Sequence, residues 1–293
     1  MGNYATSFCK NYFSPLPMPR FYSPLSFFIA TVWLCLNSVA HASNDKNALG
    51  ARAGAMGGAS VTAVDAFSVF ANQAALARLK SLSIGIYAEN RFLVSDLQLY
   101  AAGLALPTRR SGTFGVGMSH FGNELYDEKQ IRLGYGRRLF EKLDLGIELT
   151  ALSVGMGEMG STTVFTFGVG MLYSFNQQLQ VGAHVYNPLR ISLTNQAEDR
   201  LPTVFKLGIS YAPSDKATLA VETEKNLDRS IIVKAGIEYR PVEKLYLRGG
   251  ISTSPAQYSF GLGLILGKFK IDAGAMLHES LGYTPMVSLV YGK

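Results

Sequence analysis

The residues of this sequence that could perform chemistry form no recognisable catalytic or metal-binding arrangement. Three of the four histidines, His120, His184 and His278, lie beyond residue 42, and none has a His, Asp or Glu partner at a metal-binding spacing. No serine lies in a motif typical of an activated nucleophile. The stretch Gly54–Gly58 is not a phosphate loop, because no strand precedes it and no Lys follows in register. We therefore expect neither an enzyme nor a bound cofactor or metal, with a lipid-hydrolysing β-barrel as the alternative.

Charged residues form the second chemically interesting set, because they alternate with apolar residues along short segments. The charges that we place on the polar, inward face of these segments are Arg132, Glu148, Lys206, Glu222, Lys234, Glu238, Arg248 and Asp272. They could line a polar pore or a charged substrate path. Alternatively, they could form ion pairs between neighbouring strands, which lets a barrel interior hold charge. Because both signs are mixed along the chain, we favour the ion pairs.

The alternation itself predicts fourteen β-strands after Leu82. In the segment Ile231–Arg240, for example, Ile231 and Val233 fall on one face, whereas Lys234 and Glu238 fall on the other. The predicted strands span residues 82–91, 96–106, 112–120, 128–139, 142–154, 162–174, 178–186, 202–212, 216–224, 229–239, 243–252, 256–266, 268–277 and 284–292. An even number of strands of about ten residues is typical of bacterial outer-membrane barrels.

The connections between the predicted strands alternate between two kinds. Short turns are expected at residues 107–112, 140–142, 176–178, 213–216, 241–244 and 267–268, and longer loops at 121–128, 155–161, 187–201, 225–230, 253–256 and 278–284. Outer-membrane barrels have short turns on the periplasmic side and long loops outside the cell. A soluble β-sandwich or propeller is the alternative, but its outward face should be polar. We therefore predict an all-β fold, a transmembrane outer-membrane β-barrel of about fourteen antiparallel strands.

The first 42 residues have the features of a cleaved export signal. Arg20 precedes the apolar stretch Leu25–Val39, and Ala40–Ala42 fits a small-x-small cleavage site. The stretch is shorter than the roughly 20 residues that a membrane-spanning helix needs, although a helical anchor is the alternative. Cleavage would remove both cysteines, Cys9 and Cys35, so we expect no disulfide and no thiolate metal site.

The remaining chain has no apolar run of 18 residues, yet the sequence contains 17 Phe and 15 Tyr. For an exported chain of this kind, a closed barrel is the remaining way to cross a membrane, because it pairs every backbone group internally. Cleavage after Ala42 would leave 251 residues with a formal net charge of +4, because Lys10 and Arg20 are lost, and this charge is too mild to indicate nucleic-acid binding. We expect a signal peptide over residues 1–42, a plug segment over 43–80 and a barrel over 81–293, located in the outer membrane.

The Gly/Ala-rich stretch Ala51–Leu79 shows no strand alternation, so we expect it to plug the barrel from the periplasmic side. In this stretch, Asp65 is expected to cap a short helix over Ala66–Leu76. The candidate plug or gate residues are Gly57, Gly58, Asp65, Phe67, Phe70 and Asn72. The two glycines would allow the backbone to pack closely on the wall, and the two Phe side chains could lie beside a hydrophobic ligand. Alternatively, Asp65 and Asn72 only hold the plug together.

Part of this stretch carries a resemblance to a known family. Residues 50–59 read G-A-R-A-G-A-M-G-G-A, and residues 65–77 begin Asp65-Ala66 and continue to Asn72-Gln-Ala-Ala-Leu-Ala. These segments resemble the N-terminal signature of the fatty-acid-transporter-like (FadL) barrels, and more closely that of PorV and PorQ. Tyr186-Asn-Pro188 and Gly282-Tyr-Thr-Pro285 are similar to further segments of the PorV/PorQ type. The family has Pro where this chain has Gln73, which leads us to expect a looser exit from the plug.

The resemblance implies a fourteen-stranded barrel with an N-terminal plug and two alternative functions. PorV-like proteins belong to the type IX secretion machinery, where they contact the translocon or secreted cargo. FadL-like barrels instead pass hydrophobic molecules through a plugged lumen and a lateral gap between strands. We favour the secretion role on this resemblance, with hydrophobic transport as the alternative, and expect outer-membrane lipid as a partner in either case.

Overall fold

The computed structural model describes residues 48–157, 160–192 and 200–292. The predicted signal peptide, residues 1–42, lies outside the described residues. So do residues 43–47 of the predicted plug and parts of two predicted loops. Among the described residues, no helix is long and apolar enough to cross a membrane.

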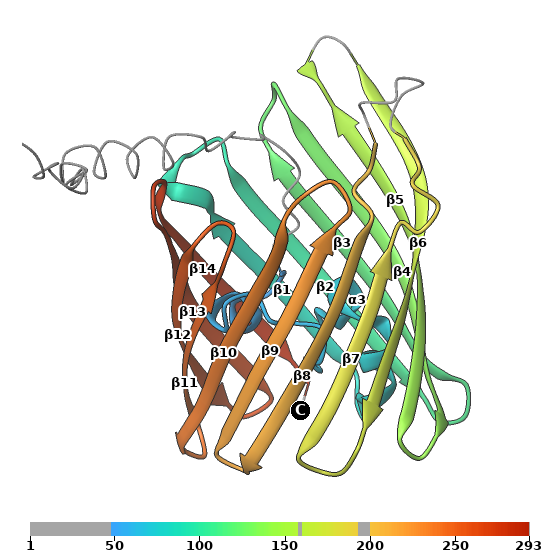
Figure 1. Cartoon of the computed structure of the whole chain (residues 1–293), viewed down its shortest axis with the longest axis vertical. Helices are drawn as coiled ribbons and strands as arrows, with labels where there is room; N and C mark the ends of the chain where they lie inside the picture. Colours follow the sequence, from blue (N-terminus) through green and yellow to red (C-terminus); the bar gives the residue numbers. More distant parts are fainter. Residues whose placement is uncertain (1–47, 158–159, 193–199, 293) are drawn as a thin grey trace, which may run out of the picture. The chain divides into compact units, whose positions relative to one another are not determined.

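The described residues form fourteen antiparallel strands that close into one barrel, with β1 paired to β14 (Figure 1). The strands are β1 (Ser83–Asn90), β2 (Gln98–Thr108), β3 (Gly112–Gly122), β4 (Asp127–Phe140), β5 (Leu143–Gly155), β6 (Ser161–Ser174), β7 (Leu179–Tyr186), β8 (Val204–Ser214), β9 (Ala217–Asn226), β10 (Ile231–Val242), β11 (Leu245–Ser252), β12 (Gln257–Leu266), β13 (Phe269–His278) and β14 (Gly282–Tyr291). The predicted fold class is confirmed, and each predicted strand has its counterpart. The boundaries differ by a few residues.

Alternation explains why these segments form a barrel wall rather than the face of a soluble sheet. Along β1, Ser83, Gly85 and Tyr87 are buried, whereas Ile84 and Ile86 between them are exposed. The outward positions of the other strands are also largely apolar, as at Leu133, Leu207 and Leu262, which are 55–59% exposed. An apolar outer face with polar groups inside is the pattern of a barrel that spans a bilayer.

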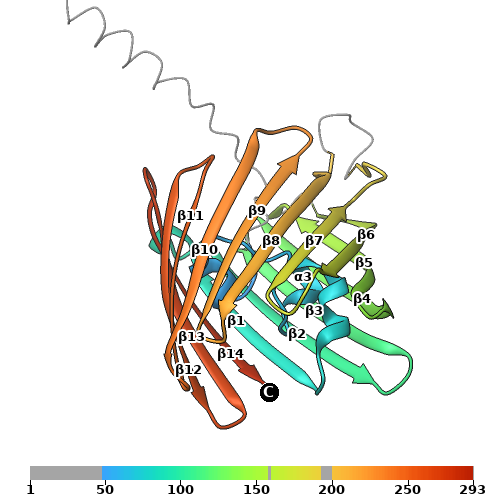
Figure 2. The same ribbon diagram turned by 60° about the horizontal axis from the view of Figure 1, so that its bottom comes forward.

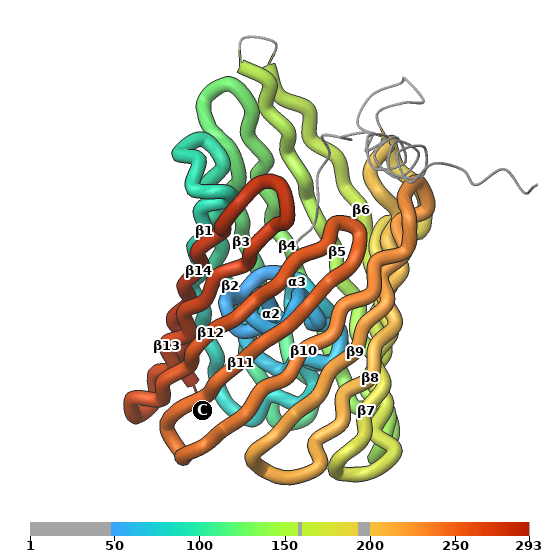
Figure 3. Tube along the Cα trace, turned by 60° about the vertical axis from the view of Figure 1, so that its left-hand side comes forward, coloured from blue at the N-terminus to red at the C-terminus, as the bar shows by residue number. Residues whose placement is uncertain are grey.

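The segment from Ala48 to Lys80 lies inside the ring of strands, as the blue trace shows (Figures 2 and 3). It contains the helices α2 (Ala51–Ala55) and α3 (Ser68–Ala71) and the 3₁₀ helix η1 (Gln73–Arg78). The helix predicted over Ala66–Leu76 is therefore wrong in its extent. Asn72 has extended backbone angles, φ −159° and ψ 107°, and these separate α3 from η1.

Candidate functional site

The contact between the plug segment and the inner wall is the region where the structure gathers the predicted functional residues. At its N-terminal part, Arg52 of α2 makes a bidentate ion pair with Glu238 of β10, at 2.9 and 3.0 Å. Glu238 also accepts from Nε of Arg248 at 2.7 Å, and Arg248 reaches Asp272 at 2.8 Å. The carboxylate of Glu238 raises the pKa of Arg52 above its ordinary value, so this side chain stays charged inside the barrel.

Glu222 of β9 holds the turn that follows α2. Its Oε2 accepts the backbone N–H groups of both Ser60 and Val61, each at 2.7 Å. The side chain is fully buried, and the Lys234 ammonium lies 3.8 Å from its other oxygen. A buried backbone N–H without an acceptor is costly, and this carboxylate satisfies two of them in a segment too irregular to satisfy them itself.

Lys234 and Lys206 both approach Glu224 of β9, at 2.6 and 3.5 Å. These three residues belong to the wall alone. The eight predicted inward charges all lie at the inner face, where each pairs with another of the eight, with Glu224 or with the plug segment.

Asn72 and Gln73 hold the second half of the plug segment. The Asn72 amide donates to Val61 O at 2.8 Å and to Met171 O of β6 at 3.0 Å, and its Oδ1 accepts from Ala74 N at 3.1 Å. The Gln73 amide donates to Val69 O at 2.9 Å and to Glu148 of β5 at 2.6 Å. The expected loosening at Gln73 is therefore not what the structure shows, because this side chain is fully buried and joins the plug to the wall.

Two further contacts complete this side of the plug. Arg132 of β4 donates to Phe70 O and to Glu148, both at 3.1 Å. Arg78 of η1 donates to Asp144 of β5 at 2.6 Å. Within the described residues, the hydrogen bonds and ion pairs between plug and wall all end on strands from β4 to β12. We call the inner face of β4–β12 the charged wall.

The opposite side of the plug makes a different kind of contact. The plug residues here are Phe67, Val69 and Phe70, which are at most 8% exposed. They pack with side chains of β1, β2, β13 and β14, namely Tyr87, Leu99, Ala101, Met276 and Met286. We call this contact, which continues over the inner face of β3, the apolar seam.

Glycines bring the plug close to the wall at the apolar seam. A Cβ added to Gly85 of β1 would lie 2.8 Å from the ring of Phe67, and one added to Gly117 of β3 would lie 2.6 Å from the ring of Phe70. Real Cβ atoms essentially never approach other atoms within 3.0 Å. The aromatic rings of the plug therefore occupy space that side chains of the wall would otherwise fill.

The remaining predicted plug residues, Gly57, Gly58 and Asp65, differ in whether they contact the wall. Gly57 has a positive φ of 70°, and a Cβ there would lie 2.5 Å from Ile251 O of β11, so this backbone does pack closely on the wall. Gly58 also has a positive φ, of 81°, but its neighbour is the Lys234 side chain. Asp65 accepts from Phe67 N at 2.9 Å within a turn before α3, so the predicted capping of a helix that starts at Ala66 is wrong.

Sequence reasoning missed Arg52, Arg78 and the acceptor role of Glu222. The signal for the first two was present, because they are the arginines in a Gly/Ala-rich segment that faces predicted lumen carboxylates. The role of Glu222 depends on where the Ser60–Val61 turn lies, and no local pattern gives that position. A buried carboxylate was also missed on the apolar side, where Glu89 accepts from Tyr87 and, at 2.7 Å, from Arg91.

Comparisons with known proteins identify the fold of this chain. No family model matches it, and no curated protein matches it by sequence. Among solved structures, it is similar to the CymD monoaromatic hydrocarbon channel, with 12% identity over 84% of this chain and 97% of that one, and a TM-score of 0.60. The Pseudomonas putida toluene transporter TodX has 12% identity over 83% and 97%, with a TM-score of 0.59.

A Pseudomonas aeruginosa FadL homologue is also similar, with 12% identity over 84% of this chain and 98% of that one, and a TM-score of 0.55. At such low identity, the likeness concerns the fold. The described residues form an all-β, closed barrel of fourteen antiparallel strands with the fold of FadL-like outer-membrane barrels.

Proposed function

We propose that this protein is an outer-membrane channel for uncharged hydrophobic small molecules, which pass between the plug and the wall along the apolar seam. The observation that carries the proposal is the seam itself, a continuous apolar contact on one side of a plug that is held by polar contacts on the other. The fold likeness to channels named for monoaromatic hydrocarbons and to a toluene transporter supports it. This likeness to channels favours transport over catalysis as the function.

The seam is the natural route because the side chains of Phe67 and Val69 make no hydrogen bond to the described part of the wall. Phe70 alone of the three seam residues also meets the charged wall, where Arg132 donates to its backbone O. A hydrophobic molecule that enters between Phe67 and Tyr87 replaces one apolar neighbour by another, so little burial is lost. Passage along the charged wall would instead separate Arg52 from Glu238 or Gln73 from Glu148, and it would leave buried charges unpaired.

Charge pairing inside the barrel favours uncharged ligands over fatty acids. The mostly buried arginines of the plug, of the inner wall and of the residue directly after β1 each have a carboxylate oxygen within 3.1 Å. They are Arg52, Arg78, Arg91, Arg132 and Arg248. A ligand carboxylate would have to compete with a carboxylate already in place, which costs more than the transfer of a neutral ring or alkyl chain.

A buried apolar cluster lies at the loop end of β5 and β6. Leu152 and Val154 of β5 face inward there, and Leu201 packs on them with 2% of its surface exposed. Val164 of β6 lies against the same cluster. We place this end outside the cell and the short turns in the periplasm, as is usual for such barrels.

The secretion role that the sequence resemblance favoured stays a prediction without further support. Neither the contacts of the described residues nor the fold likeness favours a translocon or cargo partner over a hydrophobic ligand. Co-purification of a large translocon with the tagged protein from its own membranes is the measurement that would revive it.

Reconstitution into liposomes tests the channel directly. We expect the purified protein to speed the entry of toluene into liposomes relative to protein-free liposomes, and to leave the entry of octanoate unchanged at pH 7. Octanoate has the same apolar character at one end but carries a charge. Equal acceleration of the two compounds, or none for toluene, would overturn the proposal.

A further inference from the structure

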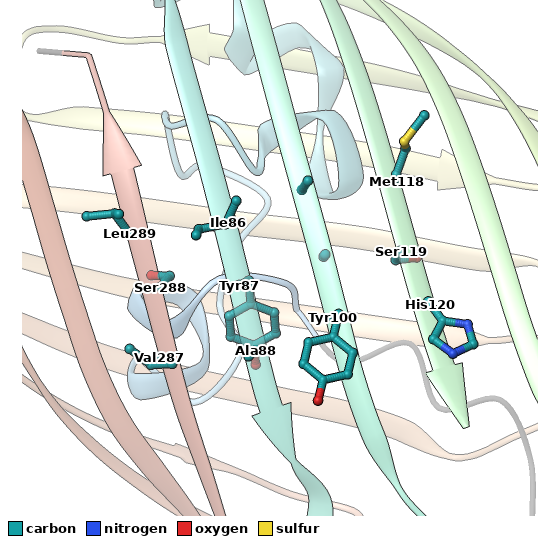
Figure 4. Close-up of a pocket in the computed structure, with 12 residues that line it drawn as sticks. Ile86, Tyr87, Ala88, Tyr100, Met118, Ser119, His120, Val287, Ser288 and Leu289 are labelled. Carbon is teal, nitrogen blue, oxygen red and sulfur yellow. The ribbon is translucent and has the colours of Figure 1, made fainter. Parts of the chain in front are cut away.

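A groove of about 500 Å³ lies on the outward face of β14, β1, β2 and β3 (Figure 4). Its volume falls within the range of small-molecule sites, roughly 300–1,000 Å³. It lies on the bilayer face of the wall, on the other side of the backbone from the apolar seam. The plug and the ion pairs of the interior therefore take no part in it.

Strand register explains the groove, because its lining consists of three adjacent rows of paired residues. The outward row on the turn side joins Leu289, Ile86, Ala102 and Met118. The outward row on the loop side joins Val287, Ala88, Tyr100 and His120. The row between them, which includes Tyr87 and Ala101, points its side chains inward. The bare backbone of that inward row forms the floor of the groove.

Residue size gives the groove its depth. Two alanines, Ala88 of β1 and Ala102 of β2, lie diagonally across this strand pair, one in each outward row. Larger apolar side chains occupy other outward positions of the two strands, namely Ile84, Ile86, Leu104 and Leu106. Ile86, Tyr100 and Met118 stand around them and are 49–55% exposed. A depression between large side chains in an apolar face has room for one flexible apolar chain.

The two ends of the groove differ in chemistry. Tyr100 and His120 lie side by side toward the end to which β1 points, which is the loop end (Figure 4). Tyr100 donates to Gln98 at 2.5 Å, and His120 pairs in register with Lys129 of β4, which is 63% exposed. Asp127 lies 2.9 Å from Lys129, so this end combines hydrogen-bond donors with little net charge. Leu289 and Ile86 leave the other end apolar.

We propose that this groove binds an acyl chain of a lipid A-type glycolipid, with a phosphorylated sugar of its headgroup at Tyr100, His120 and Lys129. An outward groove in a bilayer-spanning wall faces lipid, and the polar end selects a lipid whose headgroup lies at the loop end. A glycolipid headgroup offers phosphate oxygens to the donors His120 and Lys129, and its sugar hydroxyls can donate to the phenolic oxygen of Tyr100, whose own O–H is given to Gln98. The choice of this lipid rests on the proposed location of the loops outside the cell.

The position of the groove gives such a lipid a structural role. The backbone of Tyr87 and Ala101 separates the groove from the apolar seam, so the wall there is one strand layer thick. A bound acyl chain packs on the outside of the layer that the plug packs on from the inside.

Native mass spectrometry of the purified protein tests the lipid site. With lipid A added to the detergent solution, we expect one molecule to stay bound per wild-type chain, and far less with phosphatidylethanolamine. Ala102→Phe fills the groove from an outward position, so it should lower lipid A retention at least about tenfold, which corresponds to ~1.4 kcal/mol. Ala235→Phe, at an outward Ala of β10 on a distant part of the wall, is the matched control and should retain lipid A.

Three results would overturn the inference. The first is equal retention of lipid A by Ala102→Phe and by the wild type. The second is retention of phosphatidylethanolamine by the wild type equal to its retention of lipid A. The third is a two-chain species of the wild type that Ala102→Phe abolishes. Ala88→Phe provides a second groove-filling variant if Ala102→Phe fails to show the heat-modifiable gel mobility of a folded barrel. Lipid retention is measured without transport, so its failure would leave toluene flux, and hence the proposed channel, untouched.

Discussion

On the charged wall, the plug is held by carboxylates, amides and guanidinium groups, whereas at the apolar seam it is held by the packing of Phe67, Val69 and Phe70. Both sides are buried, and both rely on glycines that bring the plug close to the wall. The two sides differ in what can replace the contact. A hydrocarbon can substitute for an apolar neighbour, but it cannot accept the N–H groups of Ser60 and Val61 as Glu222 does.

This difference implies a division of roles within one segment. The polar contacts fix the plug in position, because removing one partner leaves the other buried and unpaired. The apolar contacts exclude water and ions while the channel is empty, and they yield to a ligand of similar polarity. Removing a single polar contact and measuring which part of the plug loosens tests this division of roles.

Glu238→Gln should have the largest effect. It weakens the bidentate pair with Arg52 and the bond to Arg248 at once, and breaking a buried pair costs ~3 kcal/mol, or about 100-fold in local opening. We expect amide hydrogen exchange of Ala51–Ala55 to rise by about that factor. Exchange measured by mass spectrometry on the reconstituted barrel checks this.

Glu224→Gln is the matched control for that change. Glu224 is a buried carboxylate on the neighbouring strand, but its partners, Lys206 and Lys234, both belong to the wall. The plug amides should therefore keep their protection. If both variants loosen Ala51–Ala55 equally, the effect is a general weakening of the barrel and the plug has no dedicated polar anchor.

Disulfide locks on the two sides should have the next largest effect, on flux. Ala66→Cys with Gly85→Cys joins plug to wall at the apolar seam, and Leu76→Cys with Gly136→Cys joins them at the charged wall. A Cβ added to either glycine lies 3.1 Å from the Cβ of its partner, a few tenths of an ångström below the usual range of about 3.5–4.5 Å. The Cβ at Gly85 also lies 2.8 Å from the Phe67 ring and the one at Gly136 lies 2.3 Å from Gln73 O, so the plug must shift in both variants. We expect the seam lock to lower toluene flux at least about tenfold, which corresponds to ~1.4 kcal/mol. The lock at the charged wall should leave flux near the wild-type rate, because that side of the plug stays in place during passage.

Reduction supplies the internal control for both locks. Dithiothreitol should restore flux in the seam-locked protein, and it should change nothing in the other. Equal inhibition by the two locks would show that the whole plug moves, and the distinction between a fixed side and a yielding side would then be wrong.

The fold was predictable because barrel strands carry their own two-residue period. Ile231–Val242, for instance, forms β10 with Lys234 and Glu238 inward, as the alternation indicates. The pattern cannot show where a strand ends. Thr108 and Gly112 extend the β2–β3 hairpin into the predicted turn, because register pairs them there.

The plug was far less predictable than the wall. Its backbone is irregular, and the extended Asn72 interrupts what looks like a helical stretch, because its side chain bonds to Val61, Met171 and Ala74 instead of continuing a helix. The inward charges were identified, yet their plug partners depend on contacts across 60 to 200 residues of sequence. Periodicity carries no information about such contacts.

Val69→Ala should have the smallest effect and is the sharpest test of the seam. Val69 of the plug is fully buried against the wall, beside Gly115 and Gly117 of β3, and its side chain makes no polar contact. Loss of its methyl groups should weaken seam packing by about 1 kcal/mol, which corresponds to roughly fivefold more frequent opening. We therefore expect toluene flux to rise by up to that factor while amide exchange at Ser60 and Val61 stays unchanged.

Val116→Ala, at an outward position of β3, is the control and should alter neither toluene flux nor amide exchange. A rise in Ser60 amide exchange with Val69→Ala would mean that the seam and the charged wall open together. The plug would then open as one cooperative unit rather than on one side.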